Sequence, residues 1–288
     1  MTATPQTLIG KTAVLTGATS GIGQAAASEL AARGARLVLV ARNPARAEET
    51  VAAIRARTPD AQVEVVRGDL ASLHEVRTAA ADVLARCPRI DVLFNNAGVV
   101  KLQRETTVDG YEATFAVNHL AYFLFTALLL DRLRATPGAR IVSTASDAHR
   151  FGGALDFDDL QAERRYRGFG VYGRSKLANI LWTRELARRL QGSGVTANCF
   201  HPGGVATRLG QTDAFWTRLV GKLMPLVLRT PEQGAATGVW LATAPELATT
   251  SGRYFANERE KRPSKHGEDD AAAKRLWEIS EELVNRVQ

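Results

Sequence analysis

Short runs of apolar and β-branched residues alternate with longer helical patterns along almost the whole chain. Strands are expected at residues 13–16, 36–41, 63–67, 91–95, 140–144, 194–200 and 252–255. Helices are expected at residues 21–33, 44–57, 72–86, 108–134, 171–190, 231–243 and 268–287. Apolar strands that are each followed by a helix predict a parallel sheet covered on both faces. Right-handed crossovers then give an α/β doubly wound fold, whose ligands bind beyond the carboxyl ends of the strands.

The bulk composition excludes several classes of protein. No linker or low-complexity run divides the 288 residues, so residues 1–288 are expected to form a single domain. The net charge of +7 comes from scattered basic residues, which favours a solvated surface and no nucleic-acid partner. Two isolated cysteines predict no metal site. Residues 1–9 lack signal-peptide features and the apolar run 120–130 is too short to span a bilayer, so we expect a cytoplasmic protein without a membrane anchor.

The turn after the first strand reads Thr-Gly-Ala-Thr-Ser-Gly-Ile-Gly at residues 16–23. Gly17 permits a tight turn, Gly21 lets backbone N–H groups approach a pyrophosphate, and Gly23 lets the helix pack closely on the sheet. The helix N-terminus offers unpaired N–H groups to phosphates. A turn without a ligand is the alternative, but the strand–turn–helix context favours a dinucleotide site. The predicted contacts of this turn are Gly17, Thr19, Ser20, Gly21, Ile22 and Gly23.

The end of the second strand indicates which dinucleotide is bound. An acidic residue there would hold the ribose 2′-hydroxyl, but Ala41 and then Arg42 occupy this place. A guanidinium can bind a 2′-phosphate bidentately, so NADP(H) is favoured over the alternative that Arg42 is a surface arginine. Ser20 and Asn43 can add hydrogen bonds to the phosphate.

Polar and small residues also follow the third and fourth strands. Asp69, before Leu70, can accept from an adenine amino group or cap the helix that begins near Ser72. Asn96, Ala97 and Gly98 suit a backbone close to a cofactor, or a simple strand-end turn.

Tyr172 and Lys176 lie four residues apart, so they share one face of a helix. A free tyrosine has a pKa of about 10, too high for a base near neutrality. A neighbouring cation lowers that pKa, which predicts an acid/base pair, although such a spacing is also common on surfaces.

Two more residues extend the predicted acid/base site. Ser146 lies just past the fifth strand, where its hydroxyl can bind a substrate oxygen, while Ser143 lies inside that strand. Asn118, in an apolar helix, can hold a water that links Lys176 to solvent, or be a satisfied core amide.

Residues 201–207 follow the sixth strand with the sequence His-Pro-Gly-Gly-Val-Ala-Thr. Val205 and Thr207 can fix a nicotinamide carboxamide, and Pro202 and Gly203 complete the predicted cofactor contacts. We expect the apolar segment 211–229 to be a substrate lid, which predicts a lipophilic substrate; a dimer contact or a core helix are the alternatives.

Taken in order, these motifs resemble the short-chain dehydrogenase/reductase family over residues 10–255. The resemblance implies a single Rossmann-fold domain for cofactor binding and catalysis. It assigns Tyr172 as general acid/base and Lys176 as a ligand of the nicotinamide ribose. It also implies that Ser146 positions the carbonyl and that Asn118 supports a proton relay.

Residues 117–130, 146–153, 172–190 and 274–283 are similar to the retinol dehydrogenase-like branch of that family. Ser-Thr-Ala at 143–145 departs from the branch, which usually has Asn-Val-Ser, and this weakens the inheritance of its substrate. We expect a lipophilic carbonyl or alcohol as substrate and a homo-oligomer, a dimer or a tetramer. A non-catalytic NADP(H)-binding sensor and a lipid or steroid carrier are the competing hypotheses.

Overall fold

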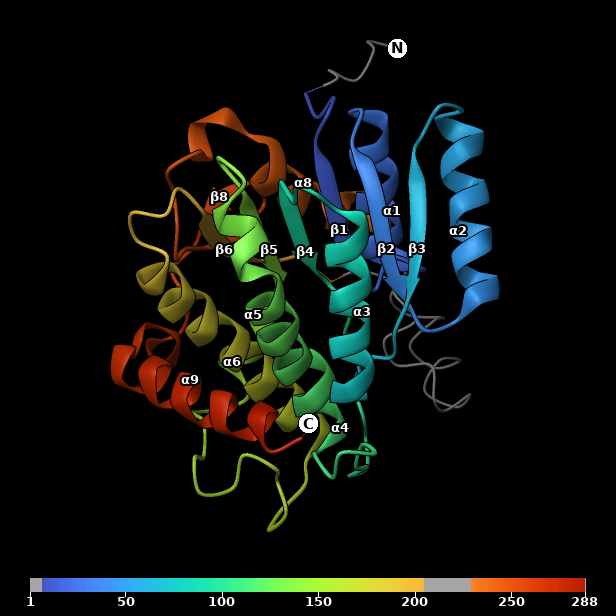
Figure 1. The fold of residues 1–288 in the computed structure, drawn as a ribbon. Helices are drawn as coiled ribbons and strands as arrows, with labels where there is room; N and C mark the ends of the chain where they lie inside the picture. Colours follow the sequence, from blue (N-terminus) through green and yellow to red (C-terminus); the bar gives the residue numbers. More distant parts are fainter. Residues whose placement is uncertain (1–6, 205–228, 288) are drawn as a thin grey trace.

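The computed structural model describes residues 7–204 and 229–287. Figure 1 shows a central sheet with helices on both faces. The strands run parallel in the order β3-β2-β1-β4-β5-β6-β7, and β8 pairs antiparallel with β7. They are β1 (Thr12–Thr16), β2 (Arg36–Ala41), β3 (Val63–Arg67), β4 (Val92–Asn95), β5 (Arg140–Thr144), β6 (Thr196–His201), β7 (Tyr254–Ala256) and β8 (Arg259–Glu260). The predicted doubly wound fold is confirmed, with its switch point between β1 and β4.

Each face of the sheet carries its own helices and its own apolar core. The helices are α1 (Gly21–Ala32), α2 (Pro44–Arg57), α3 (Leu73–Arg86), α4 (Ala113–Phe115), α5 (Ala121–Arg134), α6 (Gly168–Arg189), α8 (Pro231–Thr243) and α9 (Asp270–Asn285). One core joins α1 and α8 to the sheet through residues such as Leu30, Leu39 and Val239. The other lies under α3 and α5, around Val76 and Leu129, and α9 packs against α6 beyond it (Figure 1).

The long helix predicted at 108–134 differs from the structure at its start. It begins at Ala113 with α4, passes through a π-helical turn at Ala116–Leu120, and continues as α5. The predicted start is wrong because the fully buried Glu112 carboxylate accepts from the N–H groups of Thr114 and Phe115 and so caps the helix there. The strand β8 was not predicted, since a two-residue strand leaves no readable pattern.

Among the described residues, the stretch Ala113–Arg134 is long and apolar enough to cross a membrane. However, 83% of its apolar window is buried inside the protein. Leu120, Phe125 and Leu129 belong to the core of one sheet face. The apolar run at 120–130 is therefore part of a longer apolar stretch than the sequence suggested, and most of that stretch is buried in the protein.

Helix α8 approaches the sheet closely at Gly238. A Cβ there would lie 2.5 Å from Phe94 Cζ and 2.7 Å from Phe200 Cζ. Both rings are fully buried and packed edge to face. We expect Gly238→Ala to lower the free energy of unfolding by about 1–3 kcal/mol, because an added methyl in a filled core forces its neighbours to move.

The matched control is Gly170→Ala in the first turn of α6. There a Cβ would meet nothing closer than Arg167 Cβ at 3.7 Å. Alanine favours a helix over glycine by up to ~1 kcal/mol, so this variant should equal or exceed the wild type in stability. Urea-induced unfolding measures both, and equal stability of the two variants would contradict the packing at Gly238.

Candidate active site

A cavity of about 370 Å³ lies at the carboxyl edge of the sheet. It is lined by most of the residues predicted to bind a cofactor: Gly17, Thr19, Ser20, Gly21, Ile22, Arg42, Asp69, Leu70, Asn96, Ala97, Gly98, Tyr172, Lys176 and Pro202. The structure therefore brings the glycine turn and the Tyr–Lys pair to one cavity.

The glycine turn adopts a backbone that favours glycine at two positions. Gly17 has φ +63° and Gly21 has φ +53°, both in the left-handed region. A Cβ at Gly17 would lie 2.5 Å from Ala97 Cα, and one at Gly23 would collide with the Gly17 carbonyl oxygen. Gly23 thus packs inside the turn and does not line the cavity. The Ser20 side chain does not cap α1, so the first N–H groups of that helix face the cavity without a side-chain cap.

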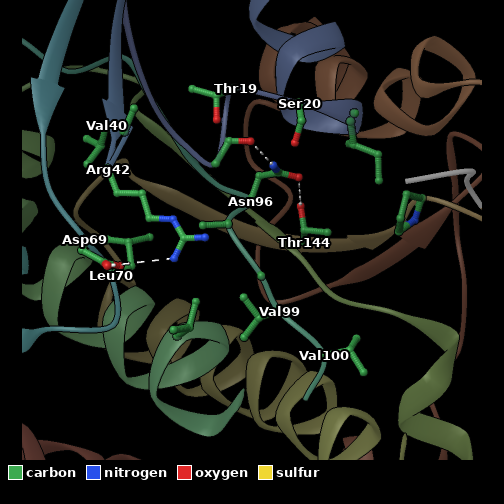
Figure 2. Close-up of a pocket in the computed structure, with 18 of the residues that line it drawn as sticks. Thr19, Ser20, Val40, Arg42, Asp69, Leu70, Asn96, Val99, Val100 and Thr144 are labelled. Carbon is green, nitrogen blue, oxygen red and sulfur yellow. Dashed lines mark hydrogen bonds and ion pairs between the residues drawn. The ribbon is translucent and has the colours of Figure 1, made fainter. Parts of the chain in front are cut away.

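Asn96 ties together the ends of β1, β4 and β5 (Figure 2). Its N–H donates to Thr16 Oγ1 at 3.0 Å, and its side-chain Nδ2 donates to the Gly17 carbonyl at 3.0 Å. Its Oδ1 accepts from Thr144 Oγ1 at 3.1 Å. Asn96 lines the cavity as predicted, but its amide holds the strand ends in place.

Two guanidinium groups lie near the ends of β2 and β3. Arg42 has a side chain that is 67% exposed, with Nη1 4.0 Å from Asp69 Oδ2, an ion pair drawn in Figure 2. Arg46, in the first turn of α2, also lines the cavity and was missed by the sequence analysis. The available signal was its place in the first turn of the helix that follows β2.

Asn43, after β2, and Asp69, after β3, have other roles in the structure than the sequence suggested. The Asn43 oxygen accepts from the Arg46 N–H at 3.1 Å and caps α2, and Asn43 does not line the cavity. The helix α3 is capped by Ser72, whose hydroxyl accepts from the Glu75 N–H at 3.3 Å. Asp69 instead accepts from the Ala71 N–H at 3.0 Å, so the alternative that Asp69 caps α3 is wrong.

Lys176 lies beneath Tyr172 on the same face of α6. Its ammonium is 5.7 Å from the centre of the Tyr172 ring, which confirms that the two share a face. Lys176 is 2% exposed, and its Nζ donates to the Thr144 carbonyl at 3.1 Å. Burial lowers the pKa of Lys176 to about 7, so the ammonium loses its proton easily.

Tyr172 differs from expectation in the direction of its pKa. Burial raises the pKa of its phenol, and a hydrogen bond with Ser146 acts in the opposite direction. The lowering expected from Lys176 does not appear, because a lysine with a pKa of about 7 carries no charge at the pH at which a phenol of raised pKa loses its proton. In this state the neutral phenol is the favoured form.

The choice of Ser146 over Ser143 agrees with the geometry. Ser143 is buried within β5, whereas Ser146 follows the end of that strand, and its hydroxyl lowers the pKa of Tyr172. The Ser146 hydroxyl also accepts from the Ala148 N–H at 3.1 Å, at the start of the 3₁₀ turn Asp147–Arg150.

Asn118 lies in the π-helical turn, fully buried. Its Oδ1 accepts from the Val99 N–H at 2.8 Å, and its Nδ2 donates to the Val99 carbonyl and to Ser175 Oγ, both at 3.0 Å. Ser175 Oγ in turn donates to the Tyr172 carbonyl at 2.7 Å. Asn118 is therefore a satisfied amide that supports the turn carrying Tyr172, and the water relay stays a prediction.

The segment after β6 is described only in part. Pro202 lines the cavity, while Gly203, at φ +90°, lies against the Arg229 side chain and not in the cavity lining. Val205, Thr207 and residues 211–228 of the expected lid lie outside the described residues. The Arg229 N–H donates to the Gly204 carbonyl at 2.8 Å.

Comparisons with known proteins identify the family of this chain. The family model for short chain dehydrogenases matches residues 11–216. Retinol dehydrogenase 13 of Homo sapiens is 43% identical over 284 residues, which cover 96% of this chain and 86% of that protein. The crystal structure of an uncharacterized protein from Mycobacterium paratuberculosis has a TM-score of 0.78 at 32% identity, covering 98% of this chain and 95% of that one. The crystal structure of a short chain dehydrogenase from Burkholderia cenocepacia in complex with NADP has a TM-score of 0.68 at 30% identity. The match covers 86% of this chain and 96% of that one.

The burial of Lys176 predicts a pH dependence of stability. Between about pH 7 and pH 10.5 the unfolded chain keeps a proton that the folded chain releases, so stability rises with pH in this window. Lys176→Met removes this effect. Relative to the wild type, the variant should gain most stability below about pH 7, and the gain should shrink as the pH rises.

Urea unfolding at about pH 6 and about pH 9 measures this difference. Lys274→Met is the control, since that side chain on α9 is 66% exposed. The free energy of unfolding of Lys274→Met should differ from that of the wild type by the same amount at both pH values. The same pH dependence in both variants would contradict the buried state of Lys176.

Proposed function

The chain belongs to the short-chain dehydrogenase family, and we propose that it interconverts a carbonyl and an alcohol on a lipophilic substrate by hydride transfer with NADP(H). One observation carries this proposal. A single cavity has the glycine turn and the N-terminus of α1 at one part of its wall, and Tyr172 and Lys176 at another. A dinucleotide joins a phosphate-bearing end to a reactive ring, so it needs both kinds of wall in one cavity.

The cavity residues fit NADP(H). The glycine turn lines the cavity where α1 begins, and that helix N-terminus has no side-chain cap, so its N–H groups could bind a pyrophosphate. Arg42 and Arg46 would hold a 2′-phosphate, and no carboxylate follows directly on β2 to repel it. To bind the phosphate, Arg42 would have to leave Asp69. The ion pair between these two side chains is weak, because it spans 4.0 Å on an exposed surface. Tyr172 and Lys176 would lie at the nicotinamide ribose.

The protein's part in the chemistry follows from two side chains. When bound, the nicotinamide supplies or accepts the hydride. The Tyr172 phenol gives its proton to the carbonyl oxygen during reduction and recovers it during oxidation. Its raised pKa favours the protonated form that reduction requires. The Ser146 hydroxyl, which acts on the pKa of Tyr172, would also bind the substrate oxygen where negative charge develops.

The substrate is proposed to be lipophilic and similar to a retinoid. Several relatives at 40% identity or above are named retinol dehydrogenases, and the segment 211–229 is rich in apolar residues. The cytoplasmic location and the homo-oligomeric state stay predictions from the sequence.

Tyr172→Phe tests the acid/base role with little change in shape. Turnover of an apolar aldehyde should fall by about 100- to 10,000-fold, because the proton donor is lost. NADPH binding, followed by fluorescence of the reduced cofactor, should persist. Turnover of Tyr172→Phe at the wild-type rate would exclude this mechanism. If the wild-type protein binds NADPH but reduces no carbonyl, the result favours the hypothesis of a non-catalytic sensor.

Arg42→Asp tests the choice of cofactor. A carboxylate at this place repels a 2′-phosphate and can accept from a 2′-hydroxyl, so NADPH affinity should fall by about 10-fold or more and NADH affinity should rise. Arg55→Asp, an exposed position further along α2, is the control for the change in net charge. Equal loss of NADPH affinity in both variants would refute a local role for Arg42.

A further inference from the structure

The turn that carries Ser146 is fastened to a distant part of the chain. Ser146, Asp147 and Ala148 are each only half-buried, beyond the end of β5. The polar groups that hold them come largely from residues 254–264, in and after the hairpin formed by β7 and β8. The reacting end of the cavity thus depends on contacts that lie more than 100 positions away in sequence.

Asp147 is the centre of this attachment. Its Oδ2 accepts from Lys261 Nζ at 2.6 Å, and its Oδ1 accepts from Tyr254 Oη at 2.9 Å. Arg150 Nε donates to the same Oδ1 at 3.3 Å. Although burial alone raises the pKa of Asp147, the hydrogen bond from Lys261 and the interaction with His201 help to lower it to about 2. The carboxylate is therefore ionised at every pH at which the protein would work.

His149 holds the backbone of Ser146 itself. Its Nε2 accepts from the Ser264 N–H at 2.9 Å, so the ring proton lies on Nδ1. That Nδ1 is 2.6 Å from the Ser146 carbonyl oxygen and donates to it. Burial lowers the pKa of His149, which keeps the ring neutral. The ring also packs edge to face on Tyr254.

His201 joins the same cluster to the turn after β6. Its Nδ1 accepts from the Asp147 N–H at 3.2 Å, and its Nε2 lies 3.5 Å from Asp147 Oδ2. Pro202, the next residue, lines the cavity. Asp147 therefore connects two loops that border the reacting end.

Helix α6 fixes the third side of the turn. A Cβ at Gly173, the residue after Tyr172, would lie 2.6 Å from the Ala148 carbonyl oxygen and 3.0 Å from the Gly152 backbone. The turn and the helix are thus in direct backbone contact beside Tyr172. A shift of the turn would change the distance between the Ser146 and Tyr172 hydroxyls.

We propose that Asp147 and His149 are positioning residues that, held by Lys261, Tyr254 and Ser264, set the Ser146 hydroxyl against Tyr172. The proposal rests on the function proposed above. It assigns the hairpin of β7 and β8 a part in the reaction, although no residue of this hairpin lines the cavity.

The test uses Asp147→Asn and Lys261→Met in the full chain. Each weakens the attachment without touching the cavity, so kcat for an apolar aldehyde should fall by about 10-fold while the KM for NADPH stays constant. Lys261→Arg keeps the cation and should retain wild-type kcat. Lys265→Met, an exposed lysine four residues on, is the control and should also match the wild type.

A second readout does not need turnover. Because the bond from Ser146 lowers the pKa of Tyr172, that pKa should rise in Asp147→Asn and Lys261→Met. The ultraviolet absorbance of each protein is titrated with pH, and the titration is repeated with Tyr172→Phe added. The difference between the two curves is the titration of the Tyr172 phenol. An unmoved Tyr172 titration would overturn the proposal, even if kcat falls. A wild type without turnover would instead refute the proposed function, and the titration would still decide this proposal.

Discussion

The side chain of Asn96 holds the site together. It joins the Gly17 carbonyl to the Thr144 hydroxyl, and the Thr144 carbonyl accepts from Lys176 Nζ. A single chain of hydrogen bonds therefore runs from the predicted phosphate turn after β1 to the lysine beside Tyr172. The parallel sheet makes this possible, since the carboxyl ends of β1, β4 and β5 lie next to each other. The spacing between the two functional ends of the cavity is thus set by the register of the sheet.

Burial acts on both titratable groups at the reacting end, and in both cases it favours the neutral form. It lowers the pKa of Lys176 to about 7 and raises the pKa of Tyr172. A site of this kind is poised to respond to charge, because a positive nicotinamide ring or a developing oxyanion meets little competing water. The hydrogen bond from Ser146 then becomes the contact that most directly tunes Tyr172, which explains why the attachment of the Ser146 turn matters.

The location of the site could be predicted from the sequence, because strand ends, a glycine turn and a four-residue helical spacing are local patterns. The strand periodicity placed Ser146 beyond β5 and Ser143 within it, as the structure has them. The cap made by Asn43 had a local signal, an asparagine directly before a proline at the helix start, whereas the ion pair of Asp69 with Arg42 joins the ends of two strands and has none. The attachment of Asp147 to Lys261 depends on a contact between two segments far apart in sequence, for which a single sequence carries no signal. The direction of the Tyr172 pKa depends on burial, which its spacing from Lys176 does not reveal.

The central claim is that this cavity transfers a hydride between NADP(H) and an apolar carbonyl. Isotope transfer tests it most directly. The wild-type protein is incubated with an apolar aldehyde and NADPH that carries deuterium on the transferable position of the nicotinamide C4, and the alcohol is analysed by mass spectrometry. We expect one deuterium on the carbinol carbon of the product. The experiment is done with NADPH labelled on one face of C4 and again with NADPH labelled on the other. Unchanged aldehyde, or an alcohol without deuterium in both experiments, would contradict hydride transfer from NADPH.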